Sequence, residues 1–324
     1  MSKSDPEAEY EALRTGWGVL ERSWISVLPV TGEDCQRFLQ GLLTCDVKAL
    51  EPGQGAYGFF TDAKGHILSD VVIRAFADRM WLELPETTAA AIVAHLEKYI
   101  VADRVEIHPP AQLVALTVAG QRSGEFLANV AGADLFAEAM RWSHRPLEIL
   151  GEGVVLAAES RMGVEAFTLW VGAGEVAALR AALMELEKPT ALPAVSFETA
   201  EILRVEAGVP VFGRDFGPEN LPQETGLDEA VSYTKGCYLG QEVIARLHYR
   251  GQVTRQIRVV RFAGAEPPPV GAPLVYDNRE AGKVTSVARS PSTGRVVGIA
   301  MLQTRAAVSG TLLACKDGGS AAVV

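Results

Sequence analysis

The chain is best understood outward from one stretch, Lys235-Gly236-Cys237-Tyr238-Leu239-Gly240-Gln241-Glu242-Val243-Ile244-Ala245-Arg246. Its two glycines frame a tight turn, at which the backbone can approach a ligand or a partner segment. Lys235 lies two residues before Cys237, and an ammonium close to that thiol would favour the reactive thiolate. Tyr238 offers a ring for stacking and a hydroxyl for hydrogen bonding. These features favour a functional segment over the alternative, a structural turn with a buried thiol.

Within this stretch, Gln241, Glu242 and Arg246 have helical spacing, so Glu242 and Arg246 would form an i, i+4 pair. Positive charge continues beyond the stretch. The run from 235 to 261 holds one anion, Glu242, and six cations: Lys235, Arg246, Arg250, Arg255, Arg258 and Arg261. Such a run is either a solvated strand face or a binding site for a polyanionic small molecule.

Composition limits the class of protein. At 324 residues, with 48% hydrophobic and 22% charged residues, the chain predicts two or three globular domains. The net charge of −10 argues against direct binding to nucleic acid or to an anionic membrane. The sequence has no apolar window long enough for a membrane span and no apolar core of a signal peptide. We therefore expect a cytoplasmic protein.

The four cysteines, Cys35, Cys45, Cys237 and Cys315, are far apart and include no C-x-x-C pair. Neither a zinc site built on paired thiolates nor a disulfide framework is predicted from them. No metal site is expected.

Residues 18–112 predict a first α+β domain. Its first helix has apolar residues at i, i+3, i+4, i+7 and i+8. These residues are Cys35, Phe38, Leu39, Leu42 and Leu43. The other predicted elements are strands at Trp24–Val30, Tyr57–Thr61, Ile67–Phe76, Met80–Leu84 and Arg104–Ile107 and a helix at Thr87–Tyr99.

Residues 113–194 repeat the order of strand, helix, strands and helix and predict a second α+β domain. Two such runs are typical of paired layers of the ferredoxin-like type. Residues 250–320 contain several short strands without helices, which predict a small β-barrel. The terminal stretch 318–322 is expected to fray.

The central stretch also resembles a known family. K-G-C-Y-x-G-Q-E followed by A-R is similar to the signature of the YgfZ family, folate-binding proteins of iron–sulfur cluster maintenance. Leu203–Pro210 resembles the L-R-x-E-A-G-x-P segment shared with the aminomethyltransferases, and Leu221–Glu224 fits the P-Q-E segment of the YgfZ branch. Arg37–Val47 matches R-F-L-Q-G-x-x-T-N-D-V, with Cys45 where Asn is usual, and Gly65–Asp70 matches G-x-I-x-x-D.

The resemblance covers residues 24–305 and implies an aminomethyltransferase-like fold. Two interleaved ferredoxin-like α+β domains and a C-terminal small β-barrel would form a ring around a central folate channel, and residues 195–246 would complete the first domain. Tetrahydrofolate is the implied cofactor, with its glutamate tail on the basic run. The implied folate-binding residues are Tyr57, Asp70, Glu206, Lys235, Tyr238, Gln241 and Arg246, and Cys237 and Asp70 are the implied catalytic residues.

The implied function is a tetrahydrofolate-binding accessory protein that supports the assembly or repair of iron–sulfur enzymes, including those that modify transfer RNA. Its partners would be reduced folate and iron–sulfur enzymes or cluster assembly proteins. One alternative is a folate-dependent aminomethyltransferase or demethylase, in which Asp70 matches the aspartate near the reactive folate nitrogen. Another is a binding module without folate, which docks a partner through the stretch from Lys235 to Arg246.

One segment departs from the aminomethyltransferases. Those enzymes share an R-T-G-Y-T-G-E-x-G-F-E segment, whose Glu recognises the pterin. The corresponding stretch here, Arg161–Phe167, is shorter and lacks the T-G-E unit. We therefore predict that the protein does not support glycine cleavage.

Overall fold

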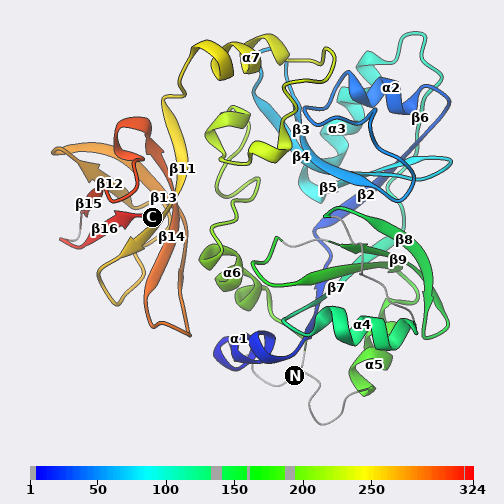
Figure 1. Cartoon of the computed structure of the whole chain (residues 1–324), viewed down its shortest axis with the longest axis horizontal. Coiled ribbons are helices and arrows are strands. Elements are labelled where there is room, and N and C mark those ends of the chain that lie inside the picture. The colour runs from blue at the N-terminus through cyan, green and yellow to red at the C-terminus, as the bar shows by residue number, and fades with distance from the viewer. Residues whose placement is uncertain (1–4, 133–140, 159–160, 187–193, 317) are drawn as a thin grey trace.

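The computed structural model describes residues 5–132, 141–158, 161–186, 194–316 and 318–324. In these ranges the chain forms two five-stranded antiparallel sheets and a closed six-stranded barrel. Figure 1 shows the two sheets above one another on one side and the barrel on the other, with α6 and the loops that follow it between them. Helices and strands are thus arranged as α+β layers plus a barrel, which confirms the predicted fold class.

The first sheet has the strand order β3-β4-β5-β2-β6. Its strands are β2 (Ile25–Thr31), β3 (Gly55–Thr61), β4 (Ile67–Ala75), β5 (Met80–Pro85) and β6 (Glu106–Ile107). Two helices, α2 (Cys35–Gln40) and α3 (Glu86–Tyr99), share one apolar core with this sheet. Helix α2 is shorter than its apolar stripe predicts: it ends at Gln40, and Leu42 and Leu43 are buried beyond its end.

The second sheet has the order β1-β7-β10-β9-β8. Its strands are β1 (Gly18–Arg22), β7 (Leu113–Ala119), β8 (His144–Ile149), β9 (Glu152–Ala158) and β10 (Ala166–Gly172), and its helices are α4 (Ser123–Ala131) and α5 (Val176–Glu185). Strand β1 pairs with β7 although it directly precedes β2 in the chain. The two domains are therefore interleaved, and the start of the span expected for the first domain lies in the second sheet.

Strand β8, like β1, has no counterpart among the predicted elements. Its sequence is His-Arg-Pro-Leu-Glu-Ile, in which a proline and two charged residues hide the strand character. Pro146 is tolerated because β8 is the edge of its sheet, where one side of the backbone needs no donor.

The barrel closes in the order β11-β14-β13-β12-β15-β16. Its strands are β11 (Arg255–Phe262), β12 (Pro273–Tyr276), β13 (Arg279–Arg289), β14 (Val296–Gln303), β15 (Leu312–Cys315) and β16 (Ser320–Val323), with a 3-10 turn, η3 (Thr304–Ala306), after β14. The predicted fraying of residues 318–322 is wrong. Strand β16 pairs with both β11 and β15, and its Ala321 and Val323 are buried, because the barrel closes only through this strand.

The remaining elements connect these three parts. They are α1 (Pro6–Thr15), α6 (Phe197–Glu206), η1 (Pro222–Glu224), η2 (Asp228–Ala230) and α7 (Gln241–Arg250). Helix α6 contacts α1 and the barrel strands β13 and β14. Later residues return to the first sheet: the Ile67 N–H donates to the Asn220 carbonyl at 3.0 Å, and the Leu239 N–H donates to the Gly41 carbonyl at 2.9 Å.

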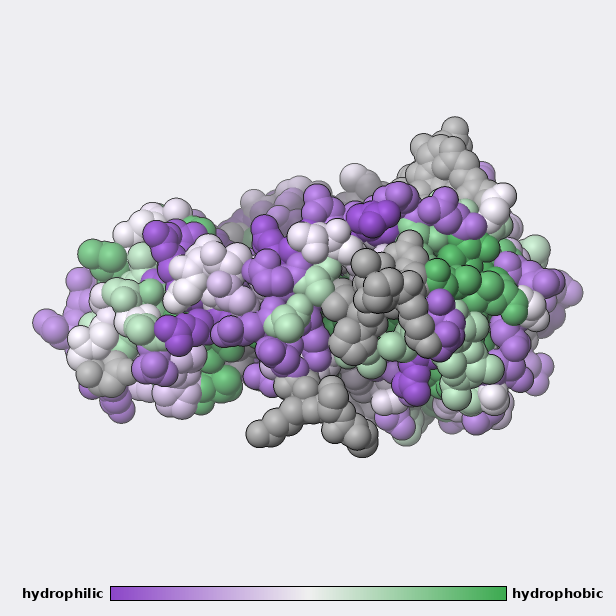
Figure 2. All heavy atoms as spheres, turned by 90° about the horizontal axis from the view of Figure 1, so that it is seen from below, coloured by the Kyte–Doolittle hydropathy of each residue, from purple (hydrophilic) through white to green (hydrophobic). Residues whose placement is uncertain are grey.

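In the parts of the chain that the structure describes, no helix is both long and apolar enough to cross a membrane. Figure 2 shows the lower face of the molecule, where hydrophilic side chains run across the middle. Hydrophobic side chains gather on this face toward the end away from the barrel.

Candidate active site

A pocket with a volume of about 400 Å³ lies between the two sheets and α6. Residues of β1, β2, β4, β5 and α6 line it, together with residues 24, 161, 162, 211, 212 and 214. Its charged lining residues are Arg22, Asp70, Glu83, Arg161, Glu201, Arg204 and Arg214, and its aromatic ones are Trp24, Phe197 and Phe212. The pocket is thus mixed in character, with flat apolar surfaces beside several guanidinium groups.

Asp70 of β4 presents a carboxylate to this pocket while only 5% of its surface is exposed. The Tyr57 hydroxyl donates a hydrogen bond to Asp70 Oδ2 at 3.0 Å, and Arg161 Nη1 lies 3.5 Å from the same oxygen. Burial raises the pKa of Tyr57 well above its usual range, so its hydroxyl stays protonated and keeps donating. These two partners fix the orientation of the carboxylate.

Arg161 covers two aromatic rings beside Asp70. Its guanidinium carbon lies 5.3 Å from the Tyr57 ring centre and 5.7 Å from that of Trp142. The two rings are themselves stacked, with centres 5.6 Å apart and planes 17° from parallel. Because the face of an aromatic ring attracts a cation, these two contacts give Arg161 a defined position at the pocket.

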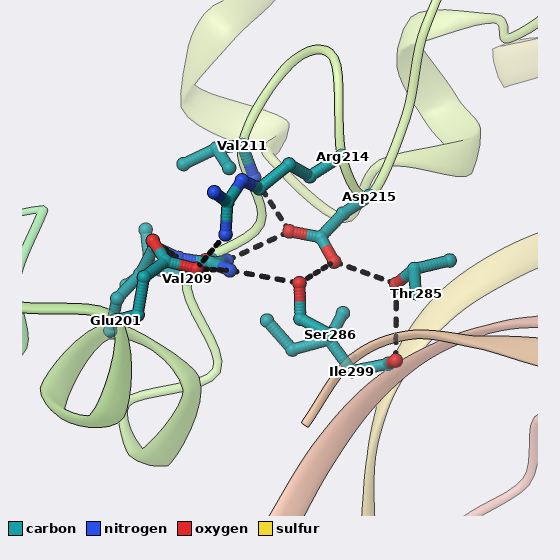
Figure 3. A network of polar contacts seen from close by, with 9 residues as sticks. Glu201, Val209, Val211, Arg214, Asp215, Thr285, Ser286 and Ile299 are labelled. Atoms are coloured by element: carbon teal, nitrogen blue, oxygen red, sulfur yellow. Dashed lines mark hydrogen bonds and ion pairs between the residues drawn. The ribbon is translucent and has the colours of Figure 1, made fainter. Parts of the chain in front are cut away.

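A polar network at the other side of the pocket attaches the barrel to α6 (Figure 3). Arg204 donates to Asp215 Oδ2 at 2.8 Å, to the Glu201 carboxylate at 2.8 and 2.9 Å, and to the Ser286 hydroxyl at 2.8 Å. The hydroxyls of Thr285 and Ser286, both on β13, donate to Asp215 Oδ1 at 2.6 and 2.7 Å. Both oxygens of the buried Asp215 carboxylate therefore accept hydrogen bonds.

Glu83 of β5 lines the pocket and is paired with a fully buried cation. Arg74 of β4 has no exposed surface, and its Nη2 lies 3.3 Å from Glu83 Oε2, with a closer contact between Nε and Oε1. Arg74 Nη1 also donates to the Trp142 carbonyl at 2.9 Å. This arginine therefore connects the first sheet to the segment that precedes β8.

Lys235, the lysine of the motif, points away from its neighbouring cysteine. It is 8% exposed, and its Nζ donates to the carbonyls of Gln40 at 2.7 Å, Leu43 at 2.6 Å and Cys45 at 2.8 Å. Burial lowers the pKa of Lys235 to about 8. The expected convergence of Lys235 and Cys237 is not found: the ammonium holds the turn after α2, and Cys237 lies exposed at the surface.

The rest of the motif is divided between core and surface. Tyr238 is 7% exposed and packs in the same apolar cluster as Tyr57. Burial raises its pKa well above the usual range. Gln241 is half-buried at the start of α7, and Arg246 is exposed on that helix. Within the described ranges no ion pair joins Arg246 to Glu242, so the expected i, i+4 pair is not formed.

Glu206 lies at the end of α6, where its Oε2 accepts a hydrogen bond from the Tyr10 hydroxyl at 2.7 Å. This contact joins α6 to α1. Of the predicted site residues, Asp70 lines the pocket, and Tyr57 is joined to Asp70 by a hydrogen bond without lining the pocket itself. The others do not line it: Cys237, Glu206, Lys235, Tyr238, Gln241 and Arg246.

Four charged residues of the pocket were not predicted as site residues: Arg22, Glu83, Arg204 and Arg214. Arg161 was noticed only as the start of a departing segment, and Arg204 only as part of the L-R-x-E-A-G match. For Arg204 this match was the available signal, because an arginine on the buried face of a helix requires a polar partner. The six-cation run contributes little here: Arg255 Nε bonds to the Glu224 carboxylate at 3.1 Å, and Arg258 bonds to the Ala307 carbonyl at 2.9 Å.

The segment without the T-G-E unit has one carboxylate, Glu165, and it serves a different purpose. Glu165 Oε2 accepts from the Gly124 N–H at 2.9 Å and from the Ser123 hydroxyl at 3.1 Å. These groups belong to the first turn of α4, whose N–H groups attract an anion. Glu165 is thus held at that helix and does not line the pocket.

No group of three or more His, Cys, Asp and Glu side chains in the described part of the chain is arranged to hold a metal ion. The groups that face the pocket, a fixed carboxylate, guanidinium groups and aromatic surfaces, suit an organic ligand with a flat ring and anionic substituents.

Comparison with known proteins finds one family, that of the glycine cleavage T-protein. Residues 3–235 match the family model described as the GCVT N-terminal domain, and residues 255–322 match the glycine cleavage T-protein C-terminal barrel domain. The aminomethyltransferase of Caldanaerobacter subterraneus subsp. tengcongensis is 25% identical over 94% of this chain and 81% of its own length. That of Halalkalibacterium halodurans is 26% identical over 95% of this chain and 84% of its own length.

A solved structure has the same fold. The glycine cleavage system aminomethyltransferase T from Bartonella henselae superposes with a TM-score of 0.88 at 23% sequence identity, covering 98% of this chain and 88% of that chain. The likeness extends over both sheets and the barrel, in agreement with the predicted aminomethyltransferase-like fold.

Proposed function

This chain belongs to the glycine cleavage T-protein family, and on that premise we propose that it binds tetrahydrofolate in the pocket beside Asp70 and acts on a one-carbon group carried by the folate. Aminomethyltransferases of this family use tetrahydrofolate. The observation that carries the proposal is the Asp70 carboxylate, which Tyr57 and Arg161 hold at the wall of a pocket of suitable size.

The pocket residues fit the parts of a folate. A pterin is a flat aromatic ring, and Phe197 and Phe212 offer apolar surfaces for it. The glutamate tail carries carboxylates, which guanidinium groups such as those of Arg22 and Arg214 can bind in a bidentate manner. Bound tetrahydrofolate would supply the nitrogen that carries the one-carbon group.

Asp70 is the residue we assign to the chemistry. Its carboxylate can accept a hydrogen bond from that nitrogen and hold a proton there. The Tyr57 hydroxyl keeps the carboxylate in one orientation, and Arg161 closes one side of the site over the two stacked rings. Asp70 and Tyr57 come from the paired strands β4 and β3 and are both buried, as an ordered reaction centre requires.

Replacing Asp70 with Asn is expected to lower one-carbon transfer by about 100-fold or more, because an amide keeps the shape of the side chain but cannot hold the proton. Affinity for tetrahydrofolate should change by less than about tenfold, since most contacts remain. Calorimetric titration and turnover with an aminomethylated carrier protein measure the two effects. Asp78→Asn, on an exposed turn, is the matched control; equal turnover in both variants would remove Asp70 from the chemistry.

A second candidate function is favoured by two observations. The segment that lacks T-G-E places Glu165 at α4 rather than at the pocket, and Cys237 of the K-G-C-Y motif is exposed. We propose as this alternative a tetrahydrofolate-binding accessory protein of the YgfZ type for iron–sulfur enzymes. Reconstitution with the other glycine-cleavage proteins separates the two: carbon dioxide release from glycine that depends on this protein supports the transferase, and folate binding without release supports the accessory role.

Under the accessory role, replacing Cys237 with Ser should abolish the ability to restore methylthio-modification of transfer RNA in cells that lack the native protein. Folding and tetrahydrofolate affinity should remain within about twofold of the parent, because the swap removes sulfur chemistry and little volume. Cys315→Ser, at a half-buried position in the barrel, is the control and should complement fully. Full complementation by the Cys237 variant would remove the thiol from this function.

A further inference from the structure

A second buried carboxylate of the pocket beside Asp70 has no role in the function proposed above. Among the described residues that line this pocket, three carry a carboxylate: Asp70, Glu83 and Glu201. The Glu201 carboxylate already accepts hydrogen bonds from two nitrogens of Arg204 and one of Arg214. Glu83 is 3% exposed. A carboxylate this deeply buried needs polar partners, so the partners of Glu83 decide what else it can bind.

Glu83 and Asp70 lie on the same face of the first sheet. Glu83 is directly opposite Val72 in the ladder between β4 and β5, and Asp70 lies two residues before Val72 on β4. Residues two apart on a strand point to the same face of the sheet. Asp70 and Glu83 are therefore diagonal neighbours, about 7–8 Å apart. Because both line the pocket, one ligand can contact both carboxylates.

Diagonal neighbours on this face are already in contact on either side of the two carboxylates. Tyr57, which is also opposite Val72, donates to Asp70 Oδ2 at 3.0 Å. Arg74 binds Glu83 Oε1 closely through Nε, whereas its Nη2 lies 3.3 Å from Oε2. This second contact is longer than the roughly 2.7–3.2 Å of an ordinary N–H···O hydrogen bond. An ionised carboxylate has about four lone-pair sites, so Glu83 can accept a further hydrogen bond from the pocket.

The spacing of the two carboxylates fits a ligand in which two nitrogens are joined through one carbon. Two C–N single bonds of about 1.45 Å place such nitrogens about 2.4 Å apart. A hydrogen bond of about 2.9 Å at each end brings the span to about 8 Å, which is of the same order as the spacing of Asp70 and Glu83. With the folate nitrogen at Asp70, the nitrogen on the other side of the transferred carbon faces Glu83.

We propose that Glu83 is a specificity-determining residue, which accepts hydrogen bonds from the amine of the one-carbon donor. The proposal rests on the function proposed above and adds the residue that recognises the donor. In the reverse direction, ammonia and the thiol of the carrier protein become joined through the methylene carbon. The two bonds from that carbon to the folate nitrogens break, and ammonia and the thiol each give one hydrogen to those nitrogens. Glu83 holds the ammonia beside the carbon.

The test is this reverse reaction, with methylenetetrahydrofolate, ammonium and the thiol form of the carrier protein. For Glu83→Gln we expect the KM for ammonium to rise about tenfold or more, because a charged acceptor is lost. The KM for methylenetetrahydrofolate should stay within about threefold of the parent value, since the other folate contacts remain. The amount of folded protein does not affect a KM, so reduced stability of the variant does not alter this comparison.

Two further variants separate the acceptor from the ion pair. Arg74→Met disturbs the same buried pair but keeps the Glu83 side chain. It should leave the KM for ammonium within about threefold of the parent value and raise the KM for methylenetetrahydrofolate, which is the opposite pattern. The double variant Arg74→Met with Glu83→Gln leaves neither charge of the pair unpaired, and it should show the ammonium defect as well.

A binding measurement without turnover checks the same contact. Methylammonium is the probe, and the fluorescence of Trp24, which lines the pocket, reports its binding to the protein loaded with tetrahydrofolate. We expect half-saturation of Glu83→Gln to require about tenfold more methylammonium than half-saturation of the parent protein. Half-saturation of both proteins at the same concentration would contradict the proposed contact.

The kinetic outcomes separate this proposal from the proposed function. If the parent protein does not catalyse the reverse reaction, the proposed function itself is removed. Equal KM values for ammonium in the parent and in Glu83→Gln leave that function in place and overturn the role of Glu83. An equal rise in Glu83→Gln and Arg74→Met also overturns it, because the effect would then come from the disturbed ion pair.

Discussion

Replacing Arg74 with Met is expected to destabilise the protein by about 3–5 kcal/mol, because the change leaves the Glu83 carboxylate buried without its cation. Glu83 is only 3% exposed and lies on β5, next to Arg74 of β4. An unpaired charge at such depth costs far more than the loss of packing, since methionine replaces the apolar part of the arginine side chain and fills much of its volume.

The effect should reach the pocket as well as the global stability. Glu83 lines the pocket, and Arg74 also donates to the backbone carbonyl of Trp142. The indole ring of Trp142 stacks on the ring of Tyr57. Loss of the arginine frees one side of this aromatic pair and with it the surface beneath Arg161. Tetrahydrofolate affinity of the surviving folded fraction should therefore fall along with stability.

Urea unfolding measures the stability change, and the chain offers a matched control. Arg79 pairs with the exposed Asp78, so Arg79→Met should cost no more than about 1 kcal/mol. The double variant Arg74→Met with Glu83→Gln should recover part of the loss, because it removes the buried charge. A change below about 1 kcal/mol for Arg74→Met, equal to that of the control, would contradict the assignment of this ion pair.

The fold could be predicted from the sequence wherever a local pattern carried the information. Alternating and helical periodicities located most strands of both sheets, and the short strands after residue 250 indicated the barrel. Strand β1 itself was not predicted, and its partner could not be found in this way. Strand pairing depends on contacts that are distant in sequence, and Gly18–Arg22 pairs with Leu113–Ala119 rather than with its neighbour β2.

The site could be predicted only where the family resemblance pointed to its residues. Asp70 and Tyr57 were identified through the resemblance, and both lie at the pocket or against it. The arginines were missed because they come from separate segments, β1, α6 and two loops, and no local pattern brings them together. Lys235 shows the opposite error: proximity in sequence to Cys237 suggested a contact, but the backbone directs the two side chains apart.

Lys235 is therefore expected to act as a structural residue, and replacing it with Met should destabilise the protein by about 2–4 kcal/mol. Three backbone carbonyls in the loop that follows α2 lose their donor, those of Gln40, Leu43 and Cys45. A buried carbonyl without a partner costs about 1–3 kcal/mol, reduced where the loop can relax. Thermal or urea unfolding measures the loss, and Lys48→Met, at an exposed position, should be nearly neutral.

The pH dependence of this difference identifies its cause. Burial lowers the pKa of Lys235 to about 8 from 10.5 in the unfolded chain. Between these values the unfolded chain binds a proton that the folded protein lacks, so the contribution of Lys235 to stability rises with pH across this window. The gap between the parent and Lys235→Met should therefore widen from pH 8 to pH 10. A gap that is constant across this range would show that folding does not lower the pKa of Lys235, and a gap near zero at every pH would mean that water satisfies the three carbonyls.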